Sequence, residues 1–479
     1  MRAIVDLPVS LTRESEVPLT TQLSDWLRSA MLNGTLAAGE RLPSSRGLAD
    51  QLGVSRTVVT EAYQQLYAEG WLDGRHGSGT FVADLEAPPE PARPVPGQVA
   101  ARPQEKPRIN LTPGEPWVHD YDIAAWKRAW RKAADLPPGN DPDPHGLPYL
   151  RDLLAAHLRR ARAVPAGPEN ILVTRGTGNG LDLVALALLG HGTRAGVEEP
   201  GYRVARNVFK ARGAEVVPCP VDEDGVIVEA LPDDLDVLYT TPAHQYPLGG
   251  RLPIPRRERL LAWARRTGAM IVEDDYDAEF RYDVAPLPAL YGLDPSRVVL
   301  LGTLSKTLAP DIGVGWLVGS EELVDAIAVK REQVSDRTSG PVQQAVVNLL
   351  ERGDLERHLR RMRLEYARRR AAVVELLGPV CSLRGDTAGL HVLAELPARL
   401  VPRVVEAAAE RGVSLDAVGR ERYHLGPARV HGLVIGYGSA SLADVRRGCR
   451  IVAELITELA TGRDSAPSAP PTPGGRAAG

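Results

Sequence analysis

The chain has 479 residues, of which 43% are hydrophobic and 25% charged, as in a soluble protein of two or three domains. No apolar run approaches the roughly 18 residues that a membrane-spanning helix needs, and the first residues lack a signal-peptide core, so we expect a cytoplasmic protein with no membrane partner. A formal net charge of −4 gives no general attraction to nucleic acid. Cys219, Cys381 and Cys449 lie far apart, which argues against a disulfide framework or a metal site.

The first 83 residues predict three helices followed by a hairpin. Apolar residues at helical spacing indicate a first helix that Gly34 closes. A second helix starts at Ser44 and a third at Ser55, each with a serine that can cap it. Two short apolar segments then flank a glycine-rich tip at residues 74–79, which is typical of a two-stranded hairpin. The expected domain is a winged helix-turn-helix.

Three segments of this domain resemble the motifs of the GntR family of bacterial transcription regulators. They are residues 42–46 (Leu-Pro-Ser-Ser-Arg), 53–57 (Gly-Val-Ser-Arg-Thr) and 77–82 (Gly-Ser-Gly-Thr-Phe-Val). The start of the third helix presents backbone amides, hydroxyls and one guanidinium, which can meet DNA phosphates and a guanine edge in the major groove. The residues expected to contact promoter DNA are Arg46, Ser55, Arg56, Thr57, His76 and Gly77.

The alternative for these residues is that they only cap and solubilise a small helical domain. Residues 1–83 hold seven arginines against nine acidic residues, and this acidic balance supports that alternative. The spacing of the three segments favours DNA binding, because it satisfies a docking geometry and not only a composition.

Composition divides the chain into four parts. Residues 84–108 contain seven prolines in twenty-five positions, which predicts a semi-rigid linker after the DNA-binding domain at residues 1–83. Residues 461–479 hold Pro, Ala, Gly and Ser without a large apolar residue, so we expect a disordered tail. The region between them, residues 109–460, forms the main domain.

Short apolar strands alternate with amphipathic helices in the main domain. The strands are expected at residues 171–174, 237–239, 270–272 and 298–301. This alternation predicts an α/β fold with a mostly parallel sheet, and ligands of such sheets bind at the carboxyl ends of the strands. Three of those ends carry unusual residues.

The first of these strand ends is followed by residues 176–180, Gly-Thr-Gly-Asn-Gly, which open an apolar helix. Free N–H groups and the helix dipole at such a start attract an anion such as a phosphate group. Leu181 stands where a dinucleotide-binding motif has its third glycine, so that motif is not met. A plain tight turn is the alternative when the glycine cluster is taken alone.

The second strand end carries residues 273–277, Glu-Asp-Asp-Tyr-Asp. Because side chains alternate along a strand, we expect Asp274 and Tyr276 on one face and the other acids, Asp277 included, on the opposite face. A carboxylate beside a pyridine ring keeps the ring nitrogen protonated, and a phenol two residues on can reach a ring oxygen. The competing interpretation is a metal site, which the division of the acids between two faces argues against.

Lys306 lies beyond the third strand end, between hydroxyl residues. The chain has six lysines against fifty-one arginines, so a lysine here needs a role that a guanidinium cannot fill. Covalent chemistry on a carbonyl group is the best such role. Thr303 and Ser305 alternate with Lys306 and can donate to a phosphate. The alternative, a surface lysine, leaves Asp274 and the glycine turn unexplained.

Four segments resemble the motifs of fold type I, pyridoxal-phosphate-dependent aminotransferases. They are residues 199–202 (Glu-Pro-Gly-Tyr), 239–249, 273–282 and 302–310. Together with the winged helix-turn-helix, they make the chain similar to the MocR (GabR-like) regulators over nearly its whole length. The resemblance implies an aminotransferase-like domain with a large part at about 150–345 and a small part at about 109–149 and 346–460. It also implies a homodimer, because fold type I sites are built at a subunit interface.

The resemblance implies pyridoxal 5′-phosphate as the cofactor and a role for each site residue. The position of Lys306 forms the internal aldimine, that of Asp274 pairs with the pyridine nitrogen, and that of Tyr202 stacks on the ring. Contacts to the 3-oxygen are implied for Tyr276, with Tyr246 as a second candidate. Phosphate contacts are implied for Thr177, Gly178 and Ser305.

Two positions depart from the aminotransferase pattern. Gly313 stands seven residues after Lys306, where the family usually has an arginine that binds phosphate. Val434 stands where aminotransferases have an arginine that binds the substrate carboxylate, and Arg429 or a partner subunit is the candidate replacement.

These features favour a DNA-binding regulator that senses pyridoxal phosphate or an amino compound by aldimine exchange at Lys306. At most, partial transamination is expected of it. The alternatives are an active aminotransferase with an accessory DNA-binding domain, which the two departures argue against, and a regulator that no longer binds the cofactor.

Overall fold

The computed structural model describes residues 9–75, 79–84, 109–137, 139–419 and 421–461. The chain divides into two compact units, residues 1–104 and 105–479. Each unit is described by itself. His76 and Gly77, two of the expected DNA contacts, lie outside the described residues. Within the described ranges, no helix has the length and apolar character needed to cross a membrane.

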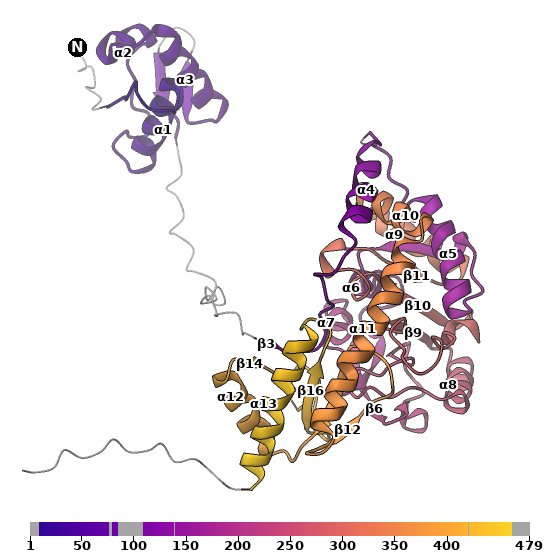
Figure 1. Cartoon of the computed structure of the whole chain (residues 1–479). Helices are drawn as coiled ribbons and strands as arrows, with labels where there is room; N and C mark the ends of the chain where they lie inside the picture. Colours follow the sequence, from indigo (N-terminus) through magenta and orange to yellow (C-terminus); the bar gives the residue numbers. More distant parts are fainter. Residues whose placement is uncertain (1–8, 76–78, 85–108, 138, 420, 462–479) are drawn as a thin grey trace, which may run out of the picture. The chain divides into compact units, whose positions relative to one another are not determined.

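The first unit is a winged helix-turn-helix (Figure 1). Its helices are α1 (Leu19–Leu32), α2 (Ser45–Leu52) and α3 (Arg56–Ala68), and its hairpin pairs β1 (Leu72–Arg75) with β2 (Gly79–Val82). Side chains from all three helices and from the hairpin fill one apolar core in which Leu23, Leu48 and Val59 are fully buried. Ser44 and Ser55 cap α2 and α3 as the sequence predicts, by accepting hydrogen bonds from the backbone N–H groups of Gly47 and Val58.

The second unit is built on an eight-stranded sheet. Its strands, in spatial order, are β4 (Ile171–Thr174), β11 (Gly315–Val318), β10 (Val298–Thr303), β9 (Met270–Asp275), β8 (Val237–Thr240), β5 (Arg194–Glu199), β6 (Glu215–Asp222) and β7 (Gly225–Val226). The strands from β10 to β6 pair in parallel, whereas β11 is antiparallel to both of its neighbours. The carboxyl ends of β4, β8, β9 and β10 therefore meet at one edge.

Both faces of this sheet are buried, which explains the continuous apolar runs in its strands. Leu300 packs into an apolar cluster on one face, and its neighbour Leu301 packs into a second cluster on the other. Helices α5 (Pro148–Arg162), α8 (Ile254–Thr267), α10 (Gly340–Glu351) and α11 (Asp354–Leu377) contribute to the first cluster. The second cluster includes α6 (Thr177–Leu188), α7 (Arg203–Ala211) and α9 (Glu321–Gln333).

A second, smaller sheet joins residues that are distant in sequence. Its strand order is β12 (Ser382–Arg384), β13 (His391–Glu395), β16 (Gly432–Gly436) and β15 (Asp416–Ala417), and β3 (Ile109–Asn110) pairs separately with β14 (Val413–Ser414). Helix α12 (Leu400–Glu410) connects β13 to β14, and α13 (Leu442–Ala460) follows β16. Helix α4 (Ile123–Ala134) packs on α10. Helices α11 and α13 lie side by side (Figure 1).

Candidate functional site

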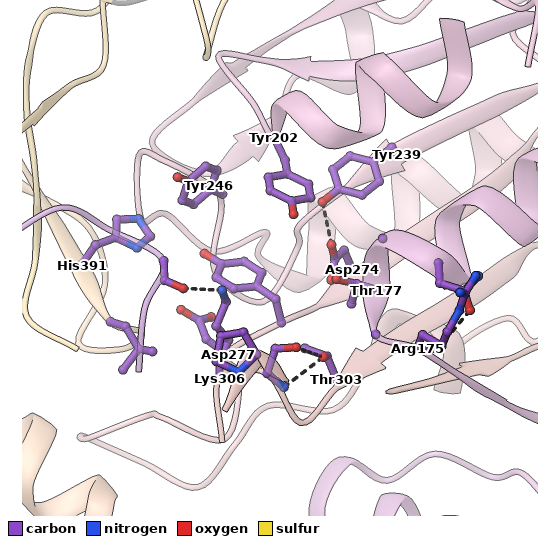
Figure 2. Close-up of a pocket in the computed structure, with 18 residues that line it drawn as sticks. Arg175, Thr177, Tyr202, Tyr239, Tyr246, Asp274, Asp277, Thr303, Lys306 and His391 are labelled. Atoms are coloured by element: carbon purple, nitrogen blue, oxygen red, sulfur yellow. Dashed lines mark hydrogen bonds between the residues drawn. The ribbon is translucent and has the colours of Figure 1, made fainter. Parts of the chain in front are cut away.

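The carboxyl ends of β4, β8, β9 and β10 surround a cavity of about 310 Å³ (Figure 2). All eight residues that the sequence predicts to hold the cofactor line it: Lys306, Asp274, Tyr276, Tyr202, Thr177, Gly178, Ser305 and Tyr246. They come from segments up to 129 positions apart, counted from Thr177 to Lys306. The convergence follows from the parallel sheet, because strands that run the same way place their following loops on one edge.

One end of the cavity is suited to an anion. Gly176 adopts the positive φ of 105° and precedes α6, so the free N–H groups of Thr177 and Gly178 stand at a helix start. Hydroxyl groups face the same turn from β10 and the loop after it. A Cβ atom at Gly176 would lie 3.5 Å from Thr303 Oγ1 and 3.7 Å from Ser305 Oγ. Amide and hydroxyl donors therefore meet at this end.

Asp274 is buried, and one of its two carboxylate oxygens makes no hydrogen bond within the described part of the chain. Its Oδ2 accepts a hydrogen bond of 2.7 Å from the Tyr239 hydroxyl, whereas Oδ1 has no hydrogen-bond partner. Burial raises the pKa of Asp274 to about 7. A buried acceptor without a partner is costly, so this oxygen is suited to a ligand that brings an N–H group.

Aromatic side chains form a wall of the cavity. The Tyr202 ring, at the start of α7, lies 6.4 Å from the ring of Tyr239 and 6.0 Å from that of Tyr246. Figure 2 shows these three rings on the same side of the cavity, across from Lys306. A flat aromatic ligand can stack against such a wall.

The structure corrects the expected placement of Asp277. Strand β9 ends at Asp275, so the alternation that assigns Asp277 to the opposite face no longer applies, and Asp277 lines the same cavity as Asp274. Its Oδ2 lies 3.0 Å from His244 Nδ1, which in turn lies 3.0 Å from the Tyr276 hydroxyl. His391 lies beside this group, and His244, Asp277 and His391 each offer one possible metal-ligand atom within 4.8 Å of the others.

The other two acids of the segment have structural partners. Glu273 accepts hydrogen bonds of 2.8 and 2.9 Å from the backbone N–H groups of Leu290 and Tyr291. Asp275 accepts two hydrogen bonds, of 2.7 and 2.8 Å, from Arg162. Both acids are thus bound on the face of β9 that points away from Asp274.

Lys306 lies three residues beyond β10, and its Nζ donates a hydrogen bond to the carbonyl oxygen of Gly114. Burial lowers the pKa of Lys306, although the carboxylates of Asp277 and Asp274 act in the opposite direction. A lowered pKa increases the neutral fraction of the amine, which is the form that attacks a carbonyl carbon.

Neither position that departs from the aminotransferase pattern offers a charged group to the cavity: one is a glycine with open space around it, and the other is a buried valine. Gly313 has a φ of 56°, and no atom lies within 4 Å of where its Cβ would be. Val434 is fully buried in an apolar cluster with Leu393 and Tyr423. Arg429, the candidate replacement, is exposed and lines a different hollow beside Arg384. It does not line the cavity of Lys306.

Four of the cavity-lining residues have roles that the sequence did not indicate. Tyr239 donates a hydrogen bond to Asp274, and the carbonyl oxygen of Gly114 accepts a hydrogen bond from Lys306 Nζ. Arg175 directly precedes the glycine turn, and His391 comes from β13 of the smaller sheet. Tyr239 belongs to the motif at residues 239–249 and Arg175 directly precedes the glycine turn, so local signals can indicate both, whereas nothing local marks Gly114 or His391.

The described DNA-contact candidates are exposed at the start of α2 and α3. Arg46, Ser55, Arg56 and Thr57 all face solvent. Arg56 Nε donates a hydrogen bond of 3.4 Å to Ser45 Oγ, which links the start of α3 to α2. The start of α3 thus presents its N–H groups, hydroxyls and one guanidinium on a single surface, as a recognition helix requires.

Each of the two units matches a known protein family. Residues 19–82 match the family described as bacterial regulatory proteins, gntR family, and residues 106–415 match aminotransferase class I and II. The pyridoxine biosynthesis transcriptional regulator PdxR of Corynebacterium glutamicum is 38% identical over 443 residues, which cover 91% of this chain and 95% of that protein. The probable rhizopine catabolism regulatory protein MocR of Rhizobium meliloti is 34% identical, with 91% and 94% covered.

The chain belongs to the MocR-like regulators of the GntR family. Among solved structures, the α-aminoadipate aminotransferase of Thermus thermophilus is 25% identical, with a TM-score of 0.66 over 74% of this chain and 93% of that one. That structure is complexed with N-(5′-phosphopyridoxyl)-L-leucine. The kynurenine aminotransferase of Pyrococcus horikoshii gives the same identity and TM-score. The predicted aminotransferase-like fold of this MocR-like chain is thus confirmed.

We expect Arg56→Ala to weaken promoter binding by this MocR-like regulator by about 10-fold or more, since one guanidinium contact to a base or phosphate contributes about 1–3 kcal/mol. If Arg56 contacts a phosphate, the slope of the logarithm of the binding constant against the logarithm of salt concentration also becomes shallower by about one unit. Fluorescence anisotropy with DNA from upstream of its own gene measures both. Arg28→Gln is the control, because Arg28 lies on α1 and pairs with Glu69. Unchanged affinity in Arg56→Ala would refute the placement of the recognition helix.

We expect Asp274→Asn to stabilise the cofactor-free protein more at pH 8 than at pH 5. The folded chain keeps the Asp274 proton up to a pKa of about 7, whereas the unfolded chain loses it near 3.8, so stability falls as pH rises between these values. Asparagine removes this dependence, so the stability of the variant relative to wild type should rise by about 2.5 kcal/mol from pH 5 to pH 8. Urea unfolding at both pH values measures the gain, and an equal difference at both would contradict the burial argument.

Proposed function

We propose that this chain is a cytoplasmic, homodimeric transcription regulator that holds pyridoxal 5′-phosphate on Lys306 and changes its promoter binding when the occupancy of that site changes. The observation that carries the proposal is the pairing, in one cavity, of a partly buried amine with a buried carboxylate oxygen that has no hydrogen-bond partner among the described residues. When bound, the cofactor supplies an aldehyde that reacts with amines and a ring that withdraws electrons.

The residues of the cavity fit the parts of that cofactor. Lys306 would take the aldehyde carbon, and Asp274 Oδ1 would accept a hydrogen bond from the protonated ring nitrogen. Tyr202 would stack on the ring. Tyr276 and Tyr246 would contact the 3-oxygen of the ring. Thr177, Gly178 and Ser305 would bind the phosphate.

A sensing role is better supported than full transamination. Val434 is buried among apolar side chains, and Arg429 lies away from the cavity. Among the described residues that line the cavity, the lysine and arginine side chains are Lys306, which reacts with the aldehyde, and Arg175, which lies at the anion end. A substrate carboxylate would therefore lack the bidentate guanidinium that aminotransferases use. We take the signal to be the cofactor or an amino compound that reacts with it. The relative named for pyridoxine biosynthesis supports a vitamer.

A spectral screen tests this proposal. Purified protein is mixed with pyridoxal phosphate, other vitamers and amino acids, and absorbance is followed together with binding to promoter DNA. We expect pyridoxal phosphate to give a protein-bound chromophore and at least one compound to shift both readouts. Colourless protein after reconstitution would overturn the cofactor assignment. Sustained turnover with an amino donor and a keto acid would instead establish an enzyme.

A further inference from the structure

The helix start and hydroxyl groups at the anion end of the cavity do not by themselves match the charge of a phosphate group. A phosphate monoester carries a charge of about −1.5 to −2 at neutral pH, whereas a helix start supplies only about half a positive charge. Position 313, the usual place of a phosphate-binding arginine, is glycine. Lys306 is engaged elsewhere, because under the proposed function its amine reacts with the aldehyde, a separate substituent of the cofactor ring. The charge must then come from another lining residue.

Arg175 is placed to supply it. It lies between the end of β4 at Thr174 and the start of α6 at Thr177, and it lines the cavity beside the glycine turn. Its backbone N–H donates a hydrogen bond of 3.0 Å to Asn179 Oδ1, which fixes the backbone of residue 175 against the first turn of α6. Figure 2 shows Arg175 next to this helix start.

The present partner of Arg175 does not depend on this arginine alone. The Arg175 guanidinium pairs with Asp336 at 2.5 Å, and the Arg175 side chain is 55% exposed whereas that of Asp336 is 10% exposed. Asp336 keeps two other partners if Arg175 leaves, since Arg331 Nε lies 3.2 Å and Asn179 Nδ2 lies 3.3 Å from its Oδ2. Rotation of the Arg175 side chain toward an anion therefore leaves no charge without a partner.

Position 313 lies in the segment that leads into a strand in contact with the same glycine turn. Gly315, at the start of β11, touches the glycine turn so closely that its Cβ would lie 2.7 Å from Gly176 Cα. Gly313 is two residues earlier in the chain and has open space around it. We propose that Arg175 carries the positive charge that binds the cofactor phosphate, in place of an arginine at position 313. This inference rests on the proposed function and adds a binding residue to it.

Comparison of two ligands that differ only in the phosphate tests this assignment. The dissociation constants of pyridoxal phosphate and pyridoxal are measured by absorbance titration for wild type, Arg175→Gln and the double variant Arg175→Gln/Gly313→Arg. We expect Arg175→Gln to weaken pyridoxal phosphate about 10- to 100-fold and to leave pyridoxal within about 2-fold. The double variant should recover most of the lost affinity for pyridoxal phosphate.

The control is Arg203→Gln, which removes an exposed arginine that does not line the cavity. Circular dichroism checks that each variant is folded. Equal binding of pyridoxal phosphate by wild type and Arg175→Gln, or equal weakening of both ligands, would overturn the assignment of Arg175. No recovery in the double variant would overturn the equivalence of positions 175 and 313. Failure of wild type to bind either compound would overturn the proposed function itself.

Discussion

Lys306→Ala is expected to abolish the covalent attachment of pyridoxal phosphate. Lys306 is partly buried in the cavity, and burial lowers the pKa of its amine, so a larger fraction is neutral and reactive than for a surface lysine. Without this amine the aldehyde has no partner in the cavity, and only the weaker noncovalent contacts of the ring and phosphate remain. Lys306→Ala should therefore remove covalent attachment completely, whereas substitutions of other cavity residues should only weaken cofactor binding.

Borohydride reduction followed by peptide mass spectrometry measures the attachment directly. In wild type, the cofactor mass should appear on the peptide that contains Lys306 and on no other. Lys330→Ala is the matched control, because Lys330 is also partly buried and its Nζ also donates to a backbone carbonyl, that of Leu186 at 3.1 Å. That variant should be labelled like wild type. A reduced adduct on any other lysine would show that the cavity is not the cofactor site.

Arg162→Met is expected to lower the free energy of unfolding of the aminotransferase-like domain by about 3–5 kcal/mol. Arg162 ends α5 and is 2% exposed, and its side chain binds both carboxylate oxygens of Asp275 and the carbonyl oxygen of Leu287. Methionine fills the volume but leaves the Asp275 carboxylate buried without its cation. Because Asp275 adjoins Asp274 on β9, loss of this pair should also loosen the site.

Urea unfolding followed by circular dichroism measures this effect, with Arg160→Met as the control. Arg160 lies on the same helix and pairs with Glu356, but both of those side chains are largely exposed, so the control should lose less than about 1 kcal/mol. A second variant, Asp275→Asn on the Arg162→Met background, should recover part of the stability. Equal unfolding midpoints for Arg162→Met and Arg160→Met would contradict the structural role of the buried pair.

Local sequence signals predict much of the fold and draw attention to Lys306, Asp274, Tyr276 and the glycine turn, whereas Tyr202 and Tyr246 are expected at the site only through the family resemblance. The serine caps, the apolar strands and the glycine turn each depend on neighbouring residues, and a parallel sheet brings its strand ends together without further information. The resemblance to known families then fixed the architecture, including the two positions, Gly313 and Val434, at which this chain departs from it.

Residues that depend on long-range packing could not be predicted in this way. His391 enters the cavity from the smaller sheet, and Gly114 lies 192 positions from the lysine that it binds. The Arg162 and Asp275 pair spans 113 positions. Asp277 was misplaced for a different reason. The alternation of side chains holds only within a strand, and nothing in an acidic run shows that the strand ends at Asp275.

The central claim is that the state of Lys306 controls the affinity for DNA. Fluorescence anisotropy with promoter DNA tests it most directly, on wild type and Lys306→Ala, each without ligand, with pyridoxal phosphate, and with pyridoxal phosphate plus the strongest compound from the spectral screen. We expect at least one of these additions to change the affinity of wild type by about 5-fold or more and to leave Lys306→Ala unchanged. Identical affinity of wild type in all three conditions would contradict the account.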